Sequence, residues 1–414
     1  MHQRLDYLDA VRAFALLLGI VFHASMSFVP IFIGWAVMDI STSSMVTSFI
    51  LVSHSFRMEL FFLIAGFFSH LTLHRKGFRS FISSRLSRIA IPLIFGWFIL
   101  RPLIVASWIM GSQSLQGEVD VLSGLKQGFQ SLEQLPADLF TGSHLWFLYY
   151  LLLVTGIALT IRAVVHSIPR LHTLITKRID PSVTWIIHSR FAWLILSVPT
   201  AASLWQMSIW GMDTPDKSLV PHWPVLTIYG GFFILGWFLH RQEGLMERLA
   251  SFTVGRGIVC IAAIWGTIVL SAYQANMGHP QIGLIRAGFV LCYALMMWSL
   301  VSLSIALFKC LFDKPSKTVR YIADSSYWLY LIHLPIVVWL QIAFAELSLH
   351  WSLKLGAISI LTIGISLLLY DLFVRSTFLG KTLNGRKRER ILFRLDLFKG
   401  NKRALGPSHA ATNS

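Results

Sequence analysis

The sequence predicts an all-α polytopic membrane protein with about ten transmembrane helices. Its composition is strongly apolar, with 55% hydrophobic and only 13% charged residues and a mean hydropathy of +0.66. This composition lies outside the range of ordinary soluble domains. In addition, apolar runs of about 20 residues recur along the chain, and about 20 helical residues are needed to cross a hydrocarbon layer of about 30 Å.

Ten apolar runs are the predicted spans. They fall near residues 10–30, 46–72, 89–111, 145–165, 191–209, 224–240, 256–274, 284–308, 327–345 and 351–374. The run at 191–209 is the least regular, because it borders a polar stretch that contains histidine. The first run resembles a signal peptide in its position, but it carries Arg12 and His23 and has no convincing small-residue cleavage site. We therefore keep it as the first span.

The basic residues predict that both termini face the cytoplasm. With that orientation, 28 of the 35 Lys and Arg residues lie in cytoplasmic loops and termini, whereas the opposite loops hold only Lys126 and Lys217. Membrane topology therefore explains the net charge of +16. A nucleic-acid partner is not expected, since the charge is spread over short loops and does not form one basic face.

Two regions are predicted, a transmembrane domain over residues 1–375 and a basic cytoplasmic tail over residues 376–414. Within residues 386–403, the side chains of Ile391, Leu392, Leu395 and Phe398 share one helical face among basic residues. This pattern predicts a helix that lies on anionic lipid, with a tail that only fixes topology as the alternative. The last nine residues are predicted to be disordered.

Ionisable residues at membrane depth are costly, so each one is a candidate for function. Arg12 and His23 are eleven residues apart and therefore face the same way on a helix, roughly 16 Å apart along its axis. That separation is comparable to an extended pantetheine arm, so Arg12 could hold phosphates while His23 meets the far end. The alternatives are an anchoring Arg12 paired with Asp9, and a His23 that only packs between helices.

The second run carries His54, Arg57 and Glu59 at about the depth of His23. His54 and Arg57 share a helical face, whereas Glu59 points elsewhere. Arg57 is suited to neutralise a carboxylate or an oxyanion. The alternative is a salt bridge between Arg57 and a buried carboxylate of another span.

Two further spans carry polar aromatic clusters. His144 and Trp146 open the fourth span, and Tyr330 and His333 lie in the ninth. His144 and Trp146 could equally be ordinary residues of the membrane interface. No glycine-rich phosphate loop, serine nucleophile elbow or metal-ligand spacing appears in a suitable context, and Cys260, Cys292 and Cys310 lie apart in apolar stretches. Histidine is therefore the expected proton-transfer group.

Five segments together resemble a known family. LDAVRAFALLLGIVFH, FFLIAGFF, SRLSRIAIP, SHLWFLYYL and YWLYLIHLPI occur in the order found in membrane acyltransferase family 3, and the resemblance covers about residues 5–375. It implies that Arg12 and His23 match the family's essential Arg and His, with His23 as the base. It also implies that Arg85 and Arg88 match the basic pair before the third span. Ala65 stands where the family usually has Ser.

The resemblance implies an acyltransferase of the bacterial inner membrane that uses acyl-CoA as donor, with no permanently bound cofactor and no metal. HSFRM and SHLWFL are most similar to members that succinylate periplasmic glucans, so succinyl-CoA and a periplasmic glucan are the expected substrates. The expected catalytic residues are His23, Arg12, His54, Arg57 and His333. The expected substrate-binding residues are Arg85, Arg88, His144, Trp146, Glu59 and Tyr330.

Three alternatives remain at this point. The chain could acetylate a lipopolysaccharide or capsule sugar. It could be a secondary transporter, because polar clusters at the bilayer midplane also line transport pathways. It could also flip a lipid-linked sugar, in which case it would consume no acyl-CoA.

Overall fold

A computed structural model describes residues 6–133, 144–276, 278–312, 314 and 316–391. The regular structure of these residues is entirely helical, as the sequence predicts. The long helices are α1 (Asp6–Ser25), α2 (Ser44–His54), α3 (Arg57–Arg85), α4 (Ile91–Ser114), α6 (Trp146–Ser167), α9 (Ala192–Leu204), α10 (Trp223–Arg241), α12 (Val254–Ser271), α13 (Ile282–Leu311), α14 (Lys317–Phe344) and α15 (Trp351–Leu369). The shorter helices are α5 (Val121–Gln130), α7 (Pro169–Leu174), α8 (Asp180–His188), α11 (Leu245–Leu249) and α16 (Phe378–Asn384), with 3-10 or π turns at η1 (Met26–Phe28), η2 (Leu86–Ala90), η3 (Ile175–Ile179), η4 (Ala272–Ala275) and η5 (Tyr370–Val374).

Eight helical segments in the described part of the chain are long and apolar enough to cross a membrane. One of them, Ser44–Ser114, contains two of the ten predicted runs, those at 46–72 and 89–111. The predicted run at 191–209 forms the shorter apolar helix α9. The multi-pass class is therefore confirmed, whereas the count of ten crossings and the orientation remain predictions.

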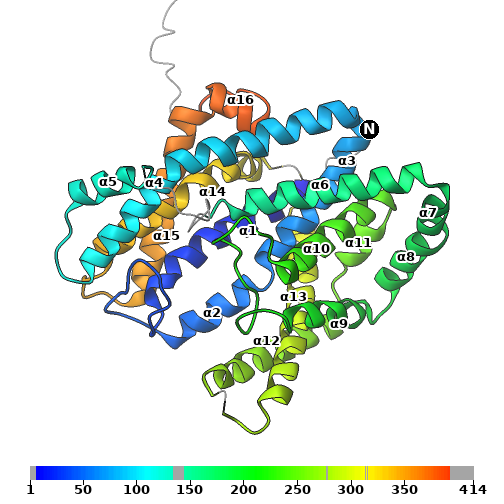
Figure 1. Cartoon of the computed structure of the whole chain (residues 1–414), viewed down its shortest axis with the longest axis horizontal. Helices are drawn as coiled ribbons and strands as arrows, with labels where there is room; N and C mark the ends of the chain where they lie inside the picture. The colour runs from blue at the N-terminus through cyan, green and yellow to red at the C-terminus, as the bar shows by residue number, and fades with distance from the viewer. Residues whose placement is uncertain (1–5, 134–143, 277, 313, 315, 392–414) are drawn as a thin grey trace, which may run out of the picture.

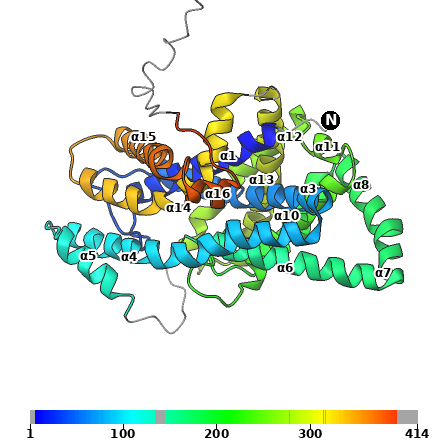
Figure 2. The same ribbon diagram turned by 90° about the horizontal axis from the view of Figure 1, so that it is seen from above.

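Helix α1 lies in the middle of the bundle, where it packs against α3, α13, α14 and α15. Figures 1 and 2 show it between two extremes of the long axis, with α5 at one end and the α7–α8 pair at the other. Small buried residues, Ala10, Ala13, Ala15 and Ala24, allow neighbouring helices to approach α1 closely. Residues carried by α1 therefore face the interior and not lipid.

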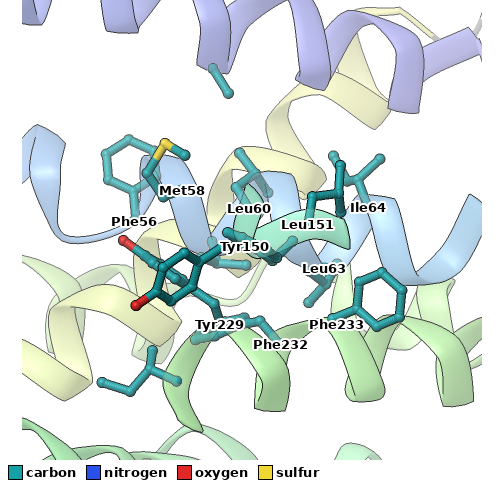
Figure 3. Packing of buried hydrophobic residues seen from close by; sticks show 14 of the residues in the cluster. Phe56, Met58, Leu60, Leu63, Ile64, Tyr150, Leu151, Tyr229, Phe232 and Phe233 are labelled. Atoms are coloured by element: carbon teal, nitrogen blue, oxygen red, sulfur yellow. The ribbon is translucent and has the colours of Figure 1, made fainter. Parts of the chain in front are cut away.

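Helices α3 and α10 approach each other closely. A Cβ atom at Gly66 would overlap the backbone carbonyl of Phe233, and one at Gly236 would overlap that of Leu63. Glycine is therefore required at both crossing points. Around this contact, aromatic and aliphatic side chains of α3, α6 and α10 form the cluster shown in Figure 3. The cluster fixes α3, which carries Arg57.

The second predicted span is interrupted. Helix α2 ends at His54 and α3 begins at Arg57, and the backbone between them leaves the helical region at Phe56. The hydroxyl of Ser55 donates to the carbonyl oxygen of Val52 at 2.8 Å, which satisfies one of the carbonyls freed at the end of α2. His54 and Arg57 are thus placed by two helices, whereas the sequence indicated a single helix face.

The beginning of the predicted tail packs against the bundle. Helix α16 contacts η2 and η5, and Figure 1 shows it at one edge of the molecule. Beyond α16, Arg388 forms an ion pair with Asp324 of α14, and the backbone N–H of Ile391 donates to Asp371 at 3.0 Å. Leu392, Leu395 and Phe398, which define the predicted lipid-facing helix, lie outside the described residues.

Candidate active site

One cavity of about 1650 Å³ passes through the helical bundle and contains most of the predicted site. We distinguish three parts of it. The basic end is lined by Arg12, Arg85 and Arg88. The histidine centre consists of His23, His54, His144 and His333, and the loop end is lined by residues between 208 and 222. Trp146, Tyr330 and Arg57 also line the cavity.

In the histidine centre, the rings of His23, His333 and His144 meet from α1, α14 and the residues before α6. The ring of His333 lies 5.3 Å from that of His23 and 5.4 Å from that of His144, measured between ring centroids. Sequence spacing within one helix could not reveal this assembly, because the three histidines belong to segments far apart in the chain. The Nδ1 atom of His23 has no hydrogen-bond partner in the described part of the chain.

Backbone carbonyls fix the neutral tautomers of two of these histidines. Nε2 of His144 lies 2.9 Å from the carbonyl oxygen of Leu331, and Nδ1 of His333 lies 2.7 Å from that of Tyr330. Since a carbonyl only accepts, each of these ring nitrogens must carry the proton. The other nitrogen of each neutral ring, Nδ1 of His144 and Nε2 of His333, therefore carries a lone pair. The Tyr330 hydroxyl donates to the carbonyl oxygen of His144 at 2.7 Å.

Arg57 is a buried cation beside this centre. Its guanidinium carbon lies 4.2 Å from the centroid of the Phe22 ring, and the ring of His54 also stacks on that of Phe22, with centroids 5.5 Å apart. Its NH1 atom has no hydrogen-bond partner among the described residues. No carboxylate of another span lies within salt-bridge distance of Arg57 in the part of the chain that the structure describes.

Glu59 is the one predicted site residue that is not part of the cavity wall. Its side chain is fully buried in the first turn of α3. Both of its carboxyl oxygens are buried without a hydrogen-bond partner among the described residues, although its place in the first helical turn is one where the helix dipole favours negative charge. The predicted contact between Glu59 and substrate is therefore not provided by this cavity.

At the basic end, each arginine is held by a different neighbour. Arg12 pairs with Asp9 at 3.3 Å and also lines the cavity. Its position is therefore compatible both with an anchoring role and with binding of a substrate. Arg85 donates to the Ser69 hydroxyl. The side chain of Arg88 lies against Gly385, where a Cβ atom would overlap its guanidinium group.

The loop end is lined by the segment between α9 and α10. Asp213 accepts hydrogen bonds from the backbone N–H of Ser208 at 2.7 Å and of Ile209 at 3.2 Å, and these contacts hold the segment in a compact turn. Thr214 Oγ1 lies 3.3 Å from Nε2 of His54, so the segment reaches the histidine centre. Burial raises the pKa of the Asp216 carboxyl above its ordinary value.

Sequence reasoning missed several residues of this site. Trp35, in the loop between α1 and α2, stacks on His23 with ring centroids 5.7 Å apart. Gln341 of α14 contacts both, and Asn384 of the tail lines the cavity. An isolated glutamine within a span also carries a desolvation cost, smaller than that of an arginine because the amide is neutral, and that was the sequence feature that could have identified Gln341.

Comparison with known proteins gives a single family. Residues 5–371 match the model of a family described as an acyltransferase domain. The chain is 25% identical over 386 residues to a protein of Salmonella gallinarum named glucans biosynthesis protein C, with 92% of this chain and 94% of the relative covered. It is 26% identical over 392 residues to the protein of that name from Salmonella typhimurium, with 92% and 96% covered. No solved structure matches the chain.

Proposed function

Because the chain belongs to this family of acyltransferases and is a multi-pass membrane protein, we propose that it transfers a succinyl group from succinyl-CoA to a hydroxyl of a periplasmic glucan. The observation that carries the proposal is the single cavity that joins three arginines to four histidines and a loop-covered end. Such a cavity can admit an anionic donor at one end and an acceptor at the other.

The donor enters from the basic end. Its phosphates bind near Arg12, Arg85 and Arg88, since guanidinium groups form strong charge-assisted hydrogen bonds with phosphate. Arg12 and His23 lie on the same helix, α1, roughly 16 Å apart along the axis. An extended pantetheine arm covers this separation and brings the thioester to the histidine centre.

His23 acts as the general base. In direct transfer it takes the proton of the glucan hydroxyl while that oxygen attacks the thioester carbonyl carbon. The tetrahedral intermediate then collapses, the carbon–sulfur bond breaks, and the CoA thiolate leaves with the proton that His23 returns. An acyl-His23 intermediate accounts for the same products: the ring nitrogen attacks the thioester carbonyl and expels the CoA thiolate, and the sugar hydroxyl then attacks the acyl group, expels the imidazole and gives up its proton, which goes to the CoA thiolate.

Arg57, His54 and His333 surround the reacting carbonyl in this proposal. Arg57 has a hydrogen-bonding nitrogen without a partner in the described residues, and a buried cation of this kind is suited to an anion. We assign it to the free carboxylate of the succinyl group or to the oxyanion of the intermediate. The further assignment is that the basic end faces the cytoplasm of a bacterial inner membrane, with both termini inside, and the loop end faces the periplasm.

The test uses purified protein in detergent with succinyl-CoA and an isolated periplasmic glucan. Release of free CoA thiol and mass spectrometry of the glucan measure the two products. We expect succinylated glucan to form in proportion to released CoA, and periplasmic oligosaccharides of cells without the protein to lack succinyl groups. Glucan that stays unmodified while acetyl-CoA is consumed with another surface sugar would overturn the proposed substrates.

A further inference from the structure

Both the oxygen and the nitrogen of the Gln341 side-chain amide form hydrogen bonds beside the site. Its Oε1 atom accepts a hydrogen bond from the indole N–H of Trp35 at 2.8 Å. Its Nε2 atom donates to the carbonyl oxygens of His23 and Ala24, both at 3.0 Å. The side chain is 1% exposed, so these three bonds replace any contact with water.

These bonds are made where α1 ends. Helix α1 stops at Ser25, and the last carbonyls of a helix have no partner within the helix. The Ser25 hydroxyl donates to the carbonyl oxygen of Phe22 at 2.7 Å, and Gln341 satisfies the next two carbonyls. Gln341 therefore fixes the backbone of the residue that carries the proposed base.

The same amide also sets the position of the imidazole. The Trp35 ring stacks on that of His23 at an interplanar angle of 16°, and Trp35 also contacts the ring of Trp108 at an interplanar angle of 72°. His333 contacts the His23 ring from α14, the helix that also carries Gln341. Since Nδ1 of His23 has no hydrogen-bond partner in the described chain, ring packing and the backbone hold the imidazole, and no side-chain acceptor orients it.

We propose that Gln341 is a positioning residue that holds His23 in its reacting orientation through the end of α1 and through the indole of Trp35. The inference rests on the proposed function, in which His23 is the base. Gln341 does not line the cavity and touches no substrate. Its effect is therefore expected on the rate of transfer and not on the affinity for the donor.

The test compares Gln341→Leu and Trp35→Phe with two control variants. Gln341→Leu removes all three bonds. Trp35→Phe removes the indole N–H together with part of the ring system and keeps an aromatic ring beside His23, and the same change in size is made in the control Trp298→Phe. The controls are Thr200→Val and Trp298→Phe. Each breaks another buried hydrogen bond, in which the indole N–H of Trp298 in α13 donates to the hydroxyl of Thr200 in α9 at 3.0 Å, and neither residue lines the cavity. Rates are expressed per succinyl-CoA binding site, so that unfolded protein does not contribute.

Misplacement of a reacting group by about 1 Å can cost about 10²-fold in rate. We expect Gln341→Leu to lower kcat and kcat/KM together by about that factor with KM for succinyl-CoA unchanged. Trp35→Phe should also lower kcat, by a smaller factor than Gln341→Leu. The double variant should lose less than the product of the two single losses, since both act through one amide. The controls should keep the kcat of the unmodified protein.

The inference is overturned if Gln341→Leu keeps the unmodified kcat per donor site, or if KM rises while kcat does not change. If Gln341→Leu does not accumulate in the membrane, Trp35→Phe decides alone, and a kcat equal to that of Trp298→Phe overturns the inference. A fully active His23→Ala variant would instead contradict the proposed function itself. The two failures are therefore distinguishable.

Discussion

At the residue scale, His23 is held in place by ring packing and not by a hydrogen bond to its ring from any described residue. Two aromatic contacts, from Trp35 and His333, hold its ring, and its Nδ1 atom has no partner in the described part of the chain. A base held in this way depends little on a neighbouring carboxylate. Removing the imidazole should therefore remove proton transfer and leave the packing of α1 nearly intact.

We expect His23→Ala to reduce succinyl transfer by about 10²–10⁴, the usual contribution of a general base. The measurement is CoA release by purified protein, normalised to the amount of folded protein. The control is His166→Ala, because His166 is an exposed residue of α6 that does not line the cavity. Near-normal transfer by His23→Ala would exclude this residue as the base.

Arg57 offers a test of donor preference. A succinyl donor brings a carboxylate into a cavity of low dielectric constant, whereas acetyl brings none, so a buried cation favours only the former. We expect Arg57→Gln to reduce succinyl transfer far more than CoA binding and to raise the ratio of acetyl to succinyl transfer. The control is Arg101→Gln, a buried arginine of α4 that donates to Ser131 outside the cavity. A parallel loss with both donors would assign Arg57 to the oxyanion.

Most of the predicted site residues line this cavity, but the sequence predicted their arrangement in space only where one helix carries them. Arg12 and His23 follow from helical periodicity, because both lie on α1. The contact of His333 with His23 and His144 depends on how α1, α14 and the start of α6 pack, and that packing leaves no trace in local spacing. Loop residues such as Trp35 lack periodicity altogether, so they could not be predicted.

At the element scale, the loop between α1 and α2 is anchored by a buried ion pair. Lys354 of α15 lies 2.7 Å from Asp39 of this loop, and their side chains are 0% and 1% exposed. Lys354 also donates to the carbonyl oxygen of Ala345. The loop carries Trp35, so its anchor is part of what holds the site together.

Removing one partner of a buried pair leaves an uncompensated charge, which costs about 3–5 kcal/mol. We expect Lys354→Met to lower the thermal unfolding temperature of the purified protein for this reason. The double variant Lys354→Met/Asp39→Asn should recover part of the loss, because Asn carries no charge and can still accept the hydrogen bond from Ser41. A double variant that is less stable than Lys354→Met would contradict this account.

The tail forms a wall of the basic end, which composition alone did not indicate. Gly385 has a φ of +76° and no room for a Cβ atom beside Arg88. We expect Gly385→Ala to raise KM for succinyl-CoA, because Arg88 must move. The control Gly244→Ala has a similar φ of +80° with open space around it, so it carries the same backbone strain without touching Arg88. Equal KM values for the two variants would exclude a role for this contact.

At the scale of the whole molecule, the number of crossings depends on α9. Its 13 residues span roughly 20 Å, which is shorter than a hydrocarbon layer of about 30 Å. Composition and length therefore identify the other spans more readily than this one. Long apolar runs could be predicted from the sequence for the same reason, whereas the run at 191–209 was predicted as a span without any sign that its helix is only 13 residues long.

Hydrogen bonds at the loop end connect the beginning of α6 with the segment that leads into α10. The hydroxyl of Tyr149 donates to the carbonyl oxygen of Leu219 at 2.6 Å, and that of Tyr150 accepts from the backbone N–H of His222 at 2.9 Å. These contacts bring the beginnings of α6 and α10 to the same side. If α6 crosses the membrane once, the chain between α6 and α10 has to cross back, and α9 is an apolar helix in that stretch of chain.

We therefore expect ten crossings with both termini inside, in agreement with the 28 of 35 Lys and Arg residues on that side. Reporter fusions after residues 115, 177, 217 and 386 test the scheme. The fusions at 115 and 217 should report the periplasm, and those at 177 and 386 the cytoplasm. The pair at 177 and 217 is decisive for α9, because a helix that does not cross would leave both reporters on one side. A periplasmic reporter at 386 would instead reverse the orientation and place Arg12, Arg85 and Arg88 on the side without acyl-CoA, which would exclude the proposed route of the donor.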